Sequence, residues 1–167
     1  MKKILVPTDF SQEAASAIPY ALEQVRLFGA EGCSVILLNV VQDFTSYNVQ
    51  FEFGLTFIQS RELCDAAVKD SEQKLKEIAE KHFSPVHTSA VVLLATRPIH
   101  EEITAFAQKE GIFLLVIATH GRSGVKHLML GSVTERIIRQ APCPVLVVPP
   151  FHSSCSETPL LAGQKER

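Results

Sequence analysis

Apolar residues follow two alternating patterns along the chain. Short continuous apolar runs are typical of strands buried on both faces, whereas longer stretches with an apolar residue every three or four positions are typical of amphipathic helices. The short runs predict strands at residues 3–7, 34–41, 86–95, 112–118 and 144–148.

The longer stretches predict helices from Ser11 to Val25, from 57 to 82, from Pro98 to Lys109 and from 132 to 139. Pro19 lies within the first of these helices and is expected to bend it, because proline lacks an N–H and clashes with the preceding turn. Residues 43–56 contain several aromatic side chains, and their apolar positions repeat with neither a helical nor a strand period. We expect them to form a mobile flap whose rings pack at an interface rather than stack on a base.

Regular alternation of strand and helix predicts an α/β fold, an open doubly wound five-stranded parallel sheet with helices on both faces. In such sheets, ligands bind at the carboxyl ends of the strands, where the strand order reverses. The loops of interest are therefore at residues 7–11, 40–53, 95–98 and 118–132. Residues 1–150 are expected to form one domain, and the polar residues 151–167 a flexible C-terminal tail.

Composition narrows the possible functions. The chain has 16 Lys and Arg against 18 Asp and Glu, a net charge of -2, which gives no electrostatic case for a nucleic-acid partner. No apolar stretch approaches the length of about 18 residues that a membrane span needs, so a cytoplasmic protein is expected. The cysteines have no CxxC spacing and are expected to be idle thiols; they are Cys33, Cys64, Cys143 and Cys155.

The loop at residues 118–132 carries the strongest chemical signal. Its glycines permit close approach of a ligand to the backbone, and Gly131-Ser132 leads into a predicted helix, whose free N–H groups and dipole attract a phosphate. Positive charge is expected nearby from Arg122, Lys126 and His127. The pattern is typical of an anion-binding loop.

A purely structural interpretation of this loop is also open. Ser132 and Glu135 fit the S-x-x-E capping box, which needs no ligand, and glycines in loops often serve turns alone. The segment matches neither the Walker P-loop nor G-x-G-x-x-G. Asp9 likewise has a structural alternative as a partner of Ser11 at the start of the first helix.

The sequence resembles the universal stress protein family from Met1 to about Pro149. The resemblance is carried by residues 2–11, 131–136 and 142–148. The ATP-binding branch of that family has the motif G-x2-G-x9-G-[ST]. Gly121 and Gly131-Ser132 match this motif, whereas Ala118 stands in place of its first glycine. An alanine is acceptable at that position if its φ is negative.

This resemblance implies a binding site for ATP, or for AMP or ADP, with Mg²⁺ accompanying a triphosphate. Asp9 would then hydrogen-bond the adenine edge, Val40 would meet adenine through its backbone, and Gly131-Ser132-Val133 would hold phosphates. The full set of candidate residues is Pro7, Thr8, Asp9, Val40, Ala118, Thr119, His120, Gly121, Arg122, Ser123, Gly124, Gly131, Ser132, Val133 and Thr134.

The function expected from the resemblance is that of a nucleotide-binding stress-response protein acting as a dimeric switch. The family's dimer implies a homodimer through the C-terminal strand at 144–148. No catalytic residue is assigned, because His120 is expected to brace the loop and no arginine finger is evident, so any ATP hydrolysis would be slow. Asp43, Glu52 and His127 have no metal-ligand spacing.

Two other functions are considered. A nucleotide-free interaction module of the same fold would agree with Ala118 and with the aromatic segment. An adenylate-forming enzyme would need HxGH-like or SxGxDS-like elements, and the sequence contains neither.

Overall fold

A computed structural model describes residues 1–45, 52, 54, 56–120 and 130–149. The expected tail at 151–167 lies outside these residues. The five-stranded sheet is parallel and has the order β3-β2-β1-β4-β5, which confirms the predicted fold class. Its strands are β1 (Lys2–Pro7), β2 (Cys33–Gln42), β3 (Thr88–Ala95), β4 (Leu114–Ala118) and β5 (Val145–Val148).

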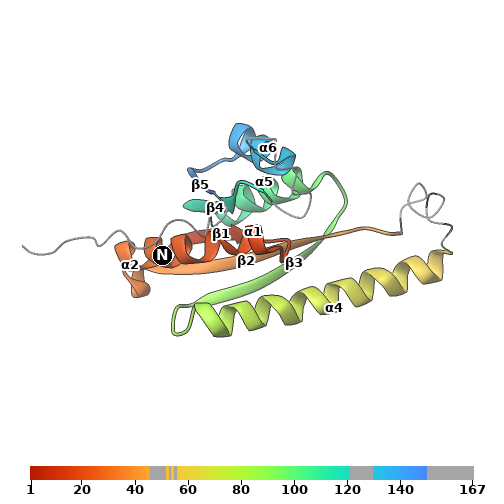
Figure 1. The fold of residues 1–167 in the computed structure, drawn as a ribbon, viewed down its shortest axis with the longest axis horizontal. Helices are drawn as coiled ribbons and strands as arrows, with labels where there is room; N and C mark the ends of the chain where they lie inside the picture. Colours follow the sequence, from red (N-terminus) through yellow and green to blue (C-terminus); the bar gives the residue numbers. More distant parts are fainter. Residues whose placement is uncertain (46–51, 53, 55, 121–129, 150–167) are drawn as a thin grey trace, which may run out of the picture.

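Helices cover both faces of the sheet, with α2 and α4 on one face and α5 and α6 on the other (Figure 1). No helix within the described ranges has the length and apolar character needed to cross a membrane. The helices are α1 (Gln12–Ala15), α2 (Ala17–Phe28), the 3-10 turn η1 (Ala30–Gly32), α4 (Phe57–His82), α5 (Ile99–Glu110) and α6 (Ser132–Gln140).

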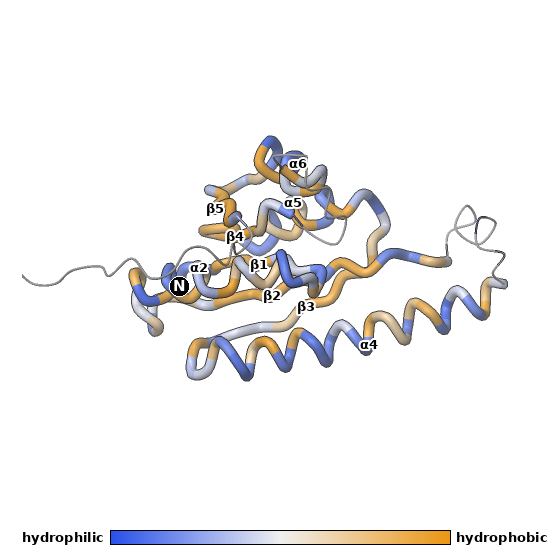
Figure 2. The backbone as a smooth tube through the Cα atoms, in the orientation of Figure 1, coloured by the Kyte–Doolittle hydropathy of each residue, from blue (hydrophilic) through white to orange (hydrophobic). Residues whose placement is uncertain are grey.

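The central strand β1 shows why the apolar runs predict the sheet correctly. Ile4 and Val6 are buried beneath α2 and α4, while Leu5, which points the other way, is buried beneath α5 and α6. A strand covered on both faces is apolar at every position rather than at alternate ones. Figure 2 shows this contrast, because the tube is hydrophobic along much of β2 and alternates in character along α4.

The first helix differs from its prediction by being divided rather than bent. Ser11 caps α1 as expected, since its side chain accepts from the Ala14 N–H. The α1 helix ends at Ala15, and α2 begins at Ala17. Pro19 lies in the first turn of α2, where its missing N–H costs least.

The fourth strand begins at Leu114 rather than at residue 112. Gly111 ends α5 in the left-handed conformation, with φ of 62°. The next residue, Ile112, still donates its N–H to the Ala107 carbonyl and is buried. An apolar run therefore includes the residue that closes the helix, and periodicity alone does not separate it from the strand.

The sheet opens between β1 and β4 toward the carboxyl ends of its strands. The β1 strand pairs with β2 along its full length, from Lys2 to Pro7, but with β4 only at Ile4 and Leu5. The strand order also reverses here, since the chain leaves β1 toward one face and β4 toward the other. Such a crevice is where doubly wound folds bind ligands.

Candidate functional site

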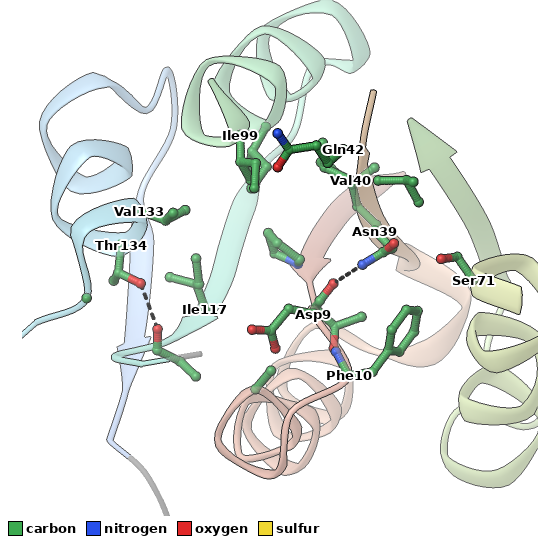
Figure 3. Close-up of a pocket in the computed structure, with 18 of the residues that line it drawn as sticks. Asp9, Phe10, Asn39, Val40, Gln42, Ser71, Ile99, Ile117, Val133 and Thr134 are labelled. Atoms are coloured by element: carbon green, nitrogen blue, oxygen red, sulfur yellow. Dashed lines mark hydrogen bonds between the residues drawn. The ribbon is translucent and has the colours of Figure 1, made fainter. Parts of the chain in front are cut away.

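A cavity of about 590 Å³ occupies this crevice (Figure 3). It is bordered by the ends of β1, β2 and β4, the first turns of α5 and α6, and the middle of α4. Its volume falls within the range of about 300–1,000 Å³ that is typical of small-molecule sites.

Most of the predicted site residues meet in this cavity. Thr119 is adjacent and contributes its backbone, whereas Gly121, Arg122, Ser123 and Gly124 lie outside the described residues, as do Lys126 and His127. The predicted residues that line the cavity are Pro7, Thr8, Asp9, Val40, Ala118, His120, Gly131, Ser132, Val133 and Thr134.

The loop after β1 is held firmly against β2. The Thr8 N–H donates to the Leu38 carbonyl at 2.8 Å, and the Asn39 side-chain amide donates to the Thr8 carbonyl at 2.7 Å. Phe10 adopts a positive φ of 65°, and its N–H donates to the Thr8 hydroxyl at 3.1 Å. This turn directs both Asp9 and the Phe10 ring into the cavity (Figure 3).

Asp9 takes the structural role that was considered for it and also lines the cavity. Its Oδ1 accepts from the Ser11 N–H at 3.0 Å and from the Ser11 hydroxyl at 2.6 Å. A carboxylate can accept several hydrogen bonds at once, because it has about four lone-pair positions. Helix capping and ligand contact are therefore compatible at this residue.

The α6 helix begins differently from the capping-box interpretation. Gly131, not Ser132, is the N-cap residue, and no side chain of the described part of the chain caps the helix. Glu135 instead forms an ion pair with Arg139. The capping-box interpretation is therefore wrong, and the N–H groups of the first turn are left without a side-chain acceptor from the helix itself.

Gly131 lies where the backbone closely approaches the end of β4. Its N–H donates to the Thr119 carbonyl at 2.8 Å, and the Thr134 hydroxyl donates to the Ala118 carbonyl at 2.9 Å. A Cβ added at Gly131 would lie 3.1 Å from the Thr119 carbonyl oxygen. These contacts hold the N-terminus of α6 at the edge of the cavity.

Both acidic side chains and a helix N-terminus border the cavity. Of the described lining residues, the charged ones are acidic, namely Asp9 and Asp70, and Asp70 is paired with Lys74 at 2.6 Å. The N-terminus of α6 lies at one side of the cavity and has positive dipole character. An elongated ligand with an anionic end is therefore oriented with that end toward Ser132.

Several lining residues were not predicted from the sequence. Asn39 has a visible signal, because it is a polar residue within the apolar run of β2. Phe10 follows the predicted Asp9 directly. Asp70 and Ser71 have no local signal, because they lie in the middle of a charge-rich helix and reach the cavity only through the packing of α4.

No group of three or more potential metal ligands is found among the residues that the structure describes. Asp43 instead accepts from the Thr45 hydroxyl at 2.6 Å and from its N–H at 2.7 Å. These hydrogen bonds lower the pKa of Asp43 below its ordinary value. Phe44 lines the cavity, while Tyr47, Phe51 and Phe53 of the expected aromatic flap lie outside the described residues.

These features define a doubly wound α/β protein with a ligand cavity at the switch point of its sheet. The sequence model of the universal stress protein family matches residues 1–149, and the chain belongs to that family. Over 151 residues it is 35% identical to universal stress protein MJ0531 of Methanocaldococcus jannaschii, covering 88% of this chain and 81% of that protein.

Solved structures agree with this assignment. The structure of MJ0577, another universal stress protein of Methanocaldococcus jannaschii, has a TM-score of 0.72 at 32% identity and covers 91% of this chain and 98% of that one. An Arabidopsis thaliana universal stress protein with AMP bound has a TM-score of 0.58 and covers 93% of this chain and 96% of that one. At 14% identity, this second likeness shows the fold alone.

Proposed function

We propose that the cavity binds an adenine nucleotide (ATP, or AMP or ADP) within a domain formed by residues 1–150. The observation that carries the proposal is the asymmetry of the cavity, which has the N-terminus of α6 at one side and the acidic side chains of Asp9 and Asp70 elsewhere in its wall. A nucleotide has the matching asymmetry, with hydrogen-bond donors on the base and negative charge on the phosphates.

The base is proposed to lie beside β2, at Asp9 and at the backbone of Val40. The phosphates extend toward the N–H groups of Ser132 and its neighbours in the first turn of α6. Mg²⁺ accompanies a triphosphate and keeps most of its waters. The hydrogen bond from Gly131 to the Thr119 carbonyl holds the N-terminus of α6 at the edge of the cavity, where its N–H groups are proposed to meet the phosphates.

Ala118 fits the proposed site despite its departure from the family motif. It is the last residue of β4, and the positive-φ residues of the described chain do not include it. An alanine therefore adds no backbone strain at this position. Nucleotide binding is further supported by the AMP-bound relative of the same fold.

The nucleotide is proposed to act as a ligand of a dimeric switch rather than as a rapidly hydrolysed substrate. Fast phosphoryl transfer requires positioned catalytic groups, and no dedicated base or arginine finger is evident in the sequence. The dimer is proposed to form at β5, which in the described sheet pairs only with β4 and leaves one edge open.

Nucleotide binding is tested by measuring the 260 nm absorbance of ligand released on denaturation and by titration calorimetry with ATP and AMP. We expect either co-purified nucleotide or saturable heat, together with an increase in the melting temperature. Absence of released nucleotide, of heat at millimolar ATP and of a melting shift would overturn the proposal and leave an interaction module of the same fold.

The dimer is tested with Val145→Lys and Val147→Lys, analysed by size exclusion with light scattering. A lysine on the open edge strand is expected to yield a folded monomer. Both valines also pack partly against the α5 and α6 face, so a melting curve must show that the variants fold. A variant that folds and remains a dimer contradicts the proposed interface.

A further inference from the structure

Two buried serines on α4 differ in how their hydroxyl groups are used. Ser60 is fully buried, and its hydroxyl donates to the Thr56 carbonyl at 3.0 Å, which is a common arrangement within helices. Ser71 is 95% buried, since its exposed fraction is 5%, and it lines the cavity. Within the described part of the chain, the Ser71 hydroxyl has no hydrogen-bond partner.

Asn39 presents a second unused polar atom on the same side of the cavity. Its exposed fraction is 6%, and its amide nitrogen donates to the Thr8 carbonyl. That bond fixes the orientation of the amide, so the carbonyl oxygen is left as an acceptor with no partner among the described residues. Figure 3 shows Asn39 and Ser71 on the side opposite Val133 and Thr134, with the Ser71 hydroxyl directed toward the cavity.

The Ser71 hydroxyl and the Asn39 oxygen are not enclosed by protein atoms but open onto the cavity, where a ligand or water can bind them. These two polar groups, from different elements, border the same space. Asp70, which precedes Ser71 on α4, also lines the cavity and is paired with Lys74. The Asn39 oxygen only accepts hydrogen bonds, whereas the Ser71 hydroxyl both accepts and donates them. Beside Asn39, a group that donates hydrogen bonds is therefore favoured over an oxygen atom that only accepts them.

We propose that Asn39 and Ser71 form a subsite for the exocyclic amino group of a nucleotide base. The proposal rests on the nucleotide binding proposed above and extends it to base specificity. An amino group carries two N–H donors, and Asn39 adjoins Val40, whose backbone is proposed to meet the base. The phosphate end of the same ligand then lies at α6, on the far side of the cavity.

The test compares AMP with purine riboside 5′-monophosphate, which lacks only the amino group, by titration calorimetry. Wild-type protein is expected to bind AMP roughly tenfold more tightly, the value of about one net hydrogen bond. Ser71→Ala is expected to lose most of this preference. Ser60→Ala removes a buried serine hydroxyl of the same helix outside the cavity and is expected to retain the preference.

Ser71→Cys provides a second variant if Ser71→Ala does not fold, because it retains the side-chain volume and weakens the hydrogen bond. Each variant is checked by its melting curve. The subsite is overturned if a folded Ser71 variant weakens both ligands equally or keeps the full preference for AMP, and nucleotide binding then still stands. If wild-type protein binds neither ligand, both proposals are overturned.

Discussion

The two ends of the sheet use polar and charged groups in opposite ways. At the amino end, the Lys2 ammonium lies 4.0 Å from the centre of the Phe28 ring and 4.6 Å from that of Phe113. Beside it, Lys3 forms an ion pair with Glu110 at 3.0 Å. At the carboxyl end, the hydroxyl of Ser71 borders the cavity with no partner among the described residues.

This contrast separates stability from binding within one sheet. The contacts at the amino end join the start of β1 to the ends of α2 and α5, so they hold together elements that are distant in sequence. The carboxyl end instead has hydrogen-bonding capacity that a ligand can satisfy. Substitutions at the two ends are therefore expected to have separable effects on unfolding and on affinity.

The largest effect, a loss of ATP affinity, is expected from Ser132→Glu at the N-terminus of α6. A carboxylate there is favourable to the helix dipole, so stability is expected to be unchanged or slightly higher. The same charge repels a nucleotide phosphate, and ATP affinity is expected to fall by roughly 100-fold, or about 2.7 kcal/mol. Titration calorimetry and thermal melting measure the two effects separately.

Ser132→Gln serves as the uncharged control for this substitution, and adenosine as the ligand without phosphates. We expect the glutamine variant to lose much less ATP affinity and adenosine to bind both variants similarly. Equal losses for ATP and adenosine would place the phosphates elsewhere.

Phe113→Ala is the corresponding change at the amino end. The Phe113 and Phe28 rings meet edge to face, with their centres 5.3 Å apart. Loss of this contact and of the Lys2 interaction is expected to lower the free energy of unfolding by about 1–2 kcal/mol. Urea denaturation measures the loss, and nucleotide affinity is expected to be unchanged.

Phe113→Leu is the matched control, because it keeps apolar contact and removes the aromatic interactions. Its loss of stability is expected to be smaller than that of the alanine variant. If Phe113→Ala weakens nucleotide binding as well, the two ends of the sheet are coupled, and stability and binding are not separated between them.

Glu102 shows that a loop at the carboxyl end can also have its polar groups satisfied. Burial raises the pKa of this carboxyl, but hydrogen bonds from the Thr96 N–H and hydroxyl and from Arg97 outweigh it and lower the pKa below its ordinary value. The stabilisation is therefore complete above the ordinary glutamate pKa of about 4.3 and is lost as the pH falls through the lower folded-state value.

Glu102→Gln is accordingly expected to cost about 1 kcal/mol of stability at neutral pH. The difference from wild type is expected to shrink as the pH falls below about 4, because the wild-type carboxyl then becomes protonated. Urea denaturation at several pH values measures this change. A difference that stays constant down to acid pH would show that the charge is not involved.

The smallest effect is expected from Ser16→Ala, at the break between α1 and α2. The Ser16 hydroxyl is fully enclosed by protein and, within the described chain, has no hydrogen-bond partner, whereas the Ser71 hydroxyl opens onto the cavity. Its removal is expected to raise the free energy of unfolding by up to about 1 kcal/mol, with no change in nucleotide affinity. A destabilised Ser16→Ala variant would indicate a buried partner, such as an ordered water.

Part of the candidate site is predictable from sequence because it follows directly from the strands. Asp9 comes just after the apolar run of β1, and Val40 lies near the end of β2, so both were expected at the carboxyl edge. Gly131-Ser132 was predicted to begin a helix near that edge. That Gly131 is the N-cap residue of this helix was not predicted, because this depends on the hydrogen bond from the Gly131 N–H to the Thr119 carbonyl.

The order and type of the elements follow from the sequence alone, because a buried parallel strand needs a continuous apolar run and a covering helix needs an apolar face, and both are local patterns. Which polar side chains of a crossover helix enter the cavity is a different matter. Ser60 and Ser71 lie on the same helix, yet only Ser71 lines the cavity. Their difference arises from how α4 packs against β2 and β3, and contacts between segments so far apart in the chain exist only in the folded protein.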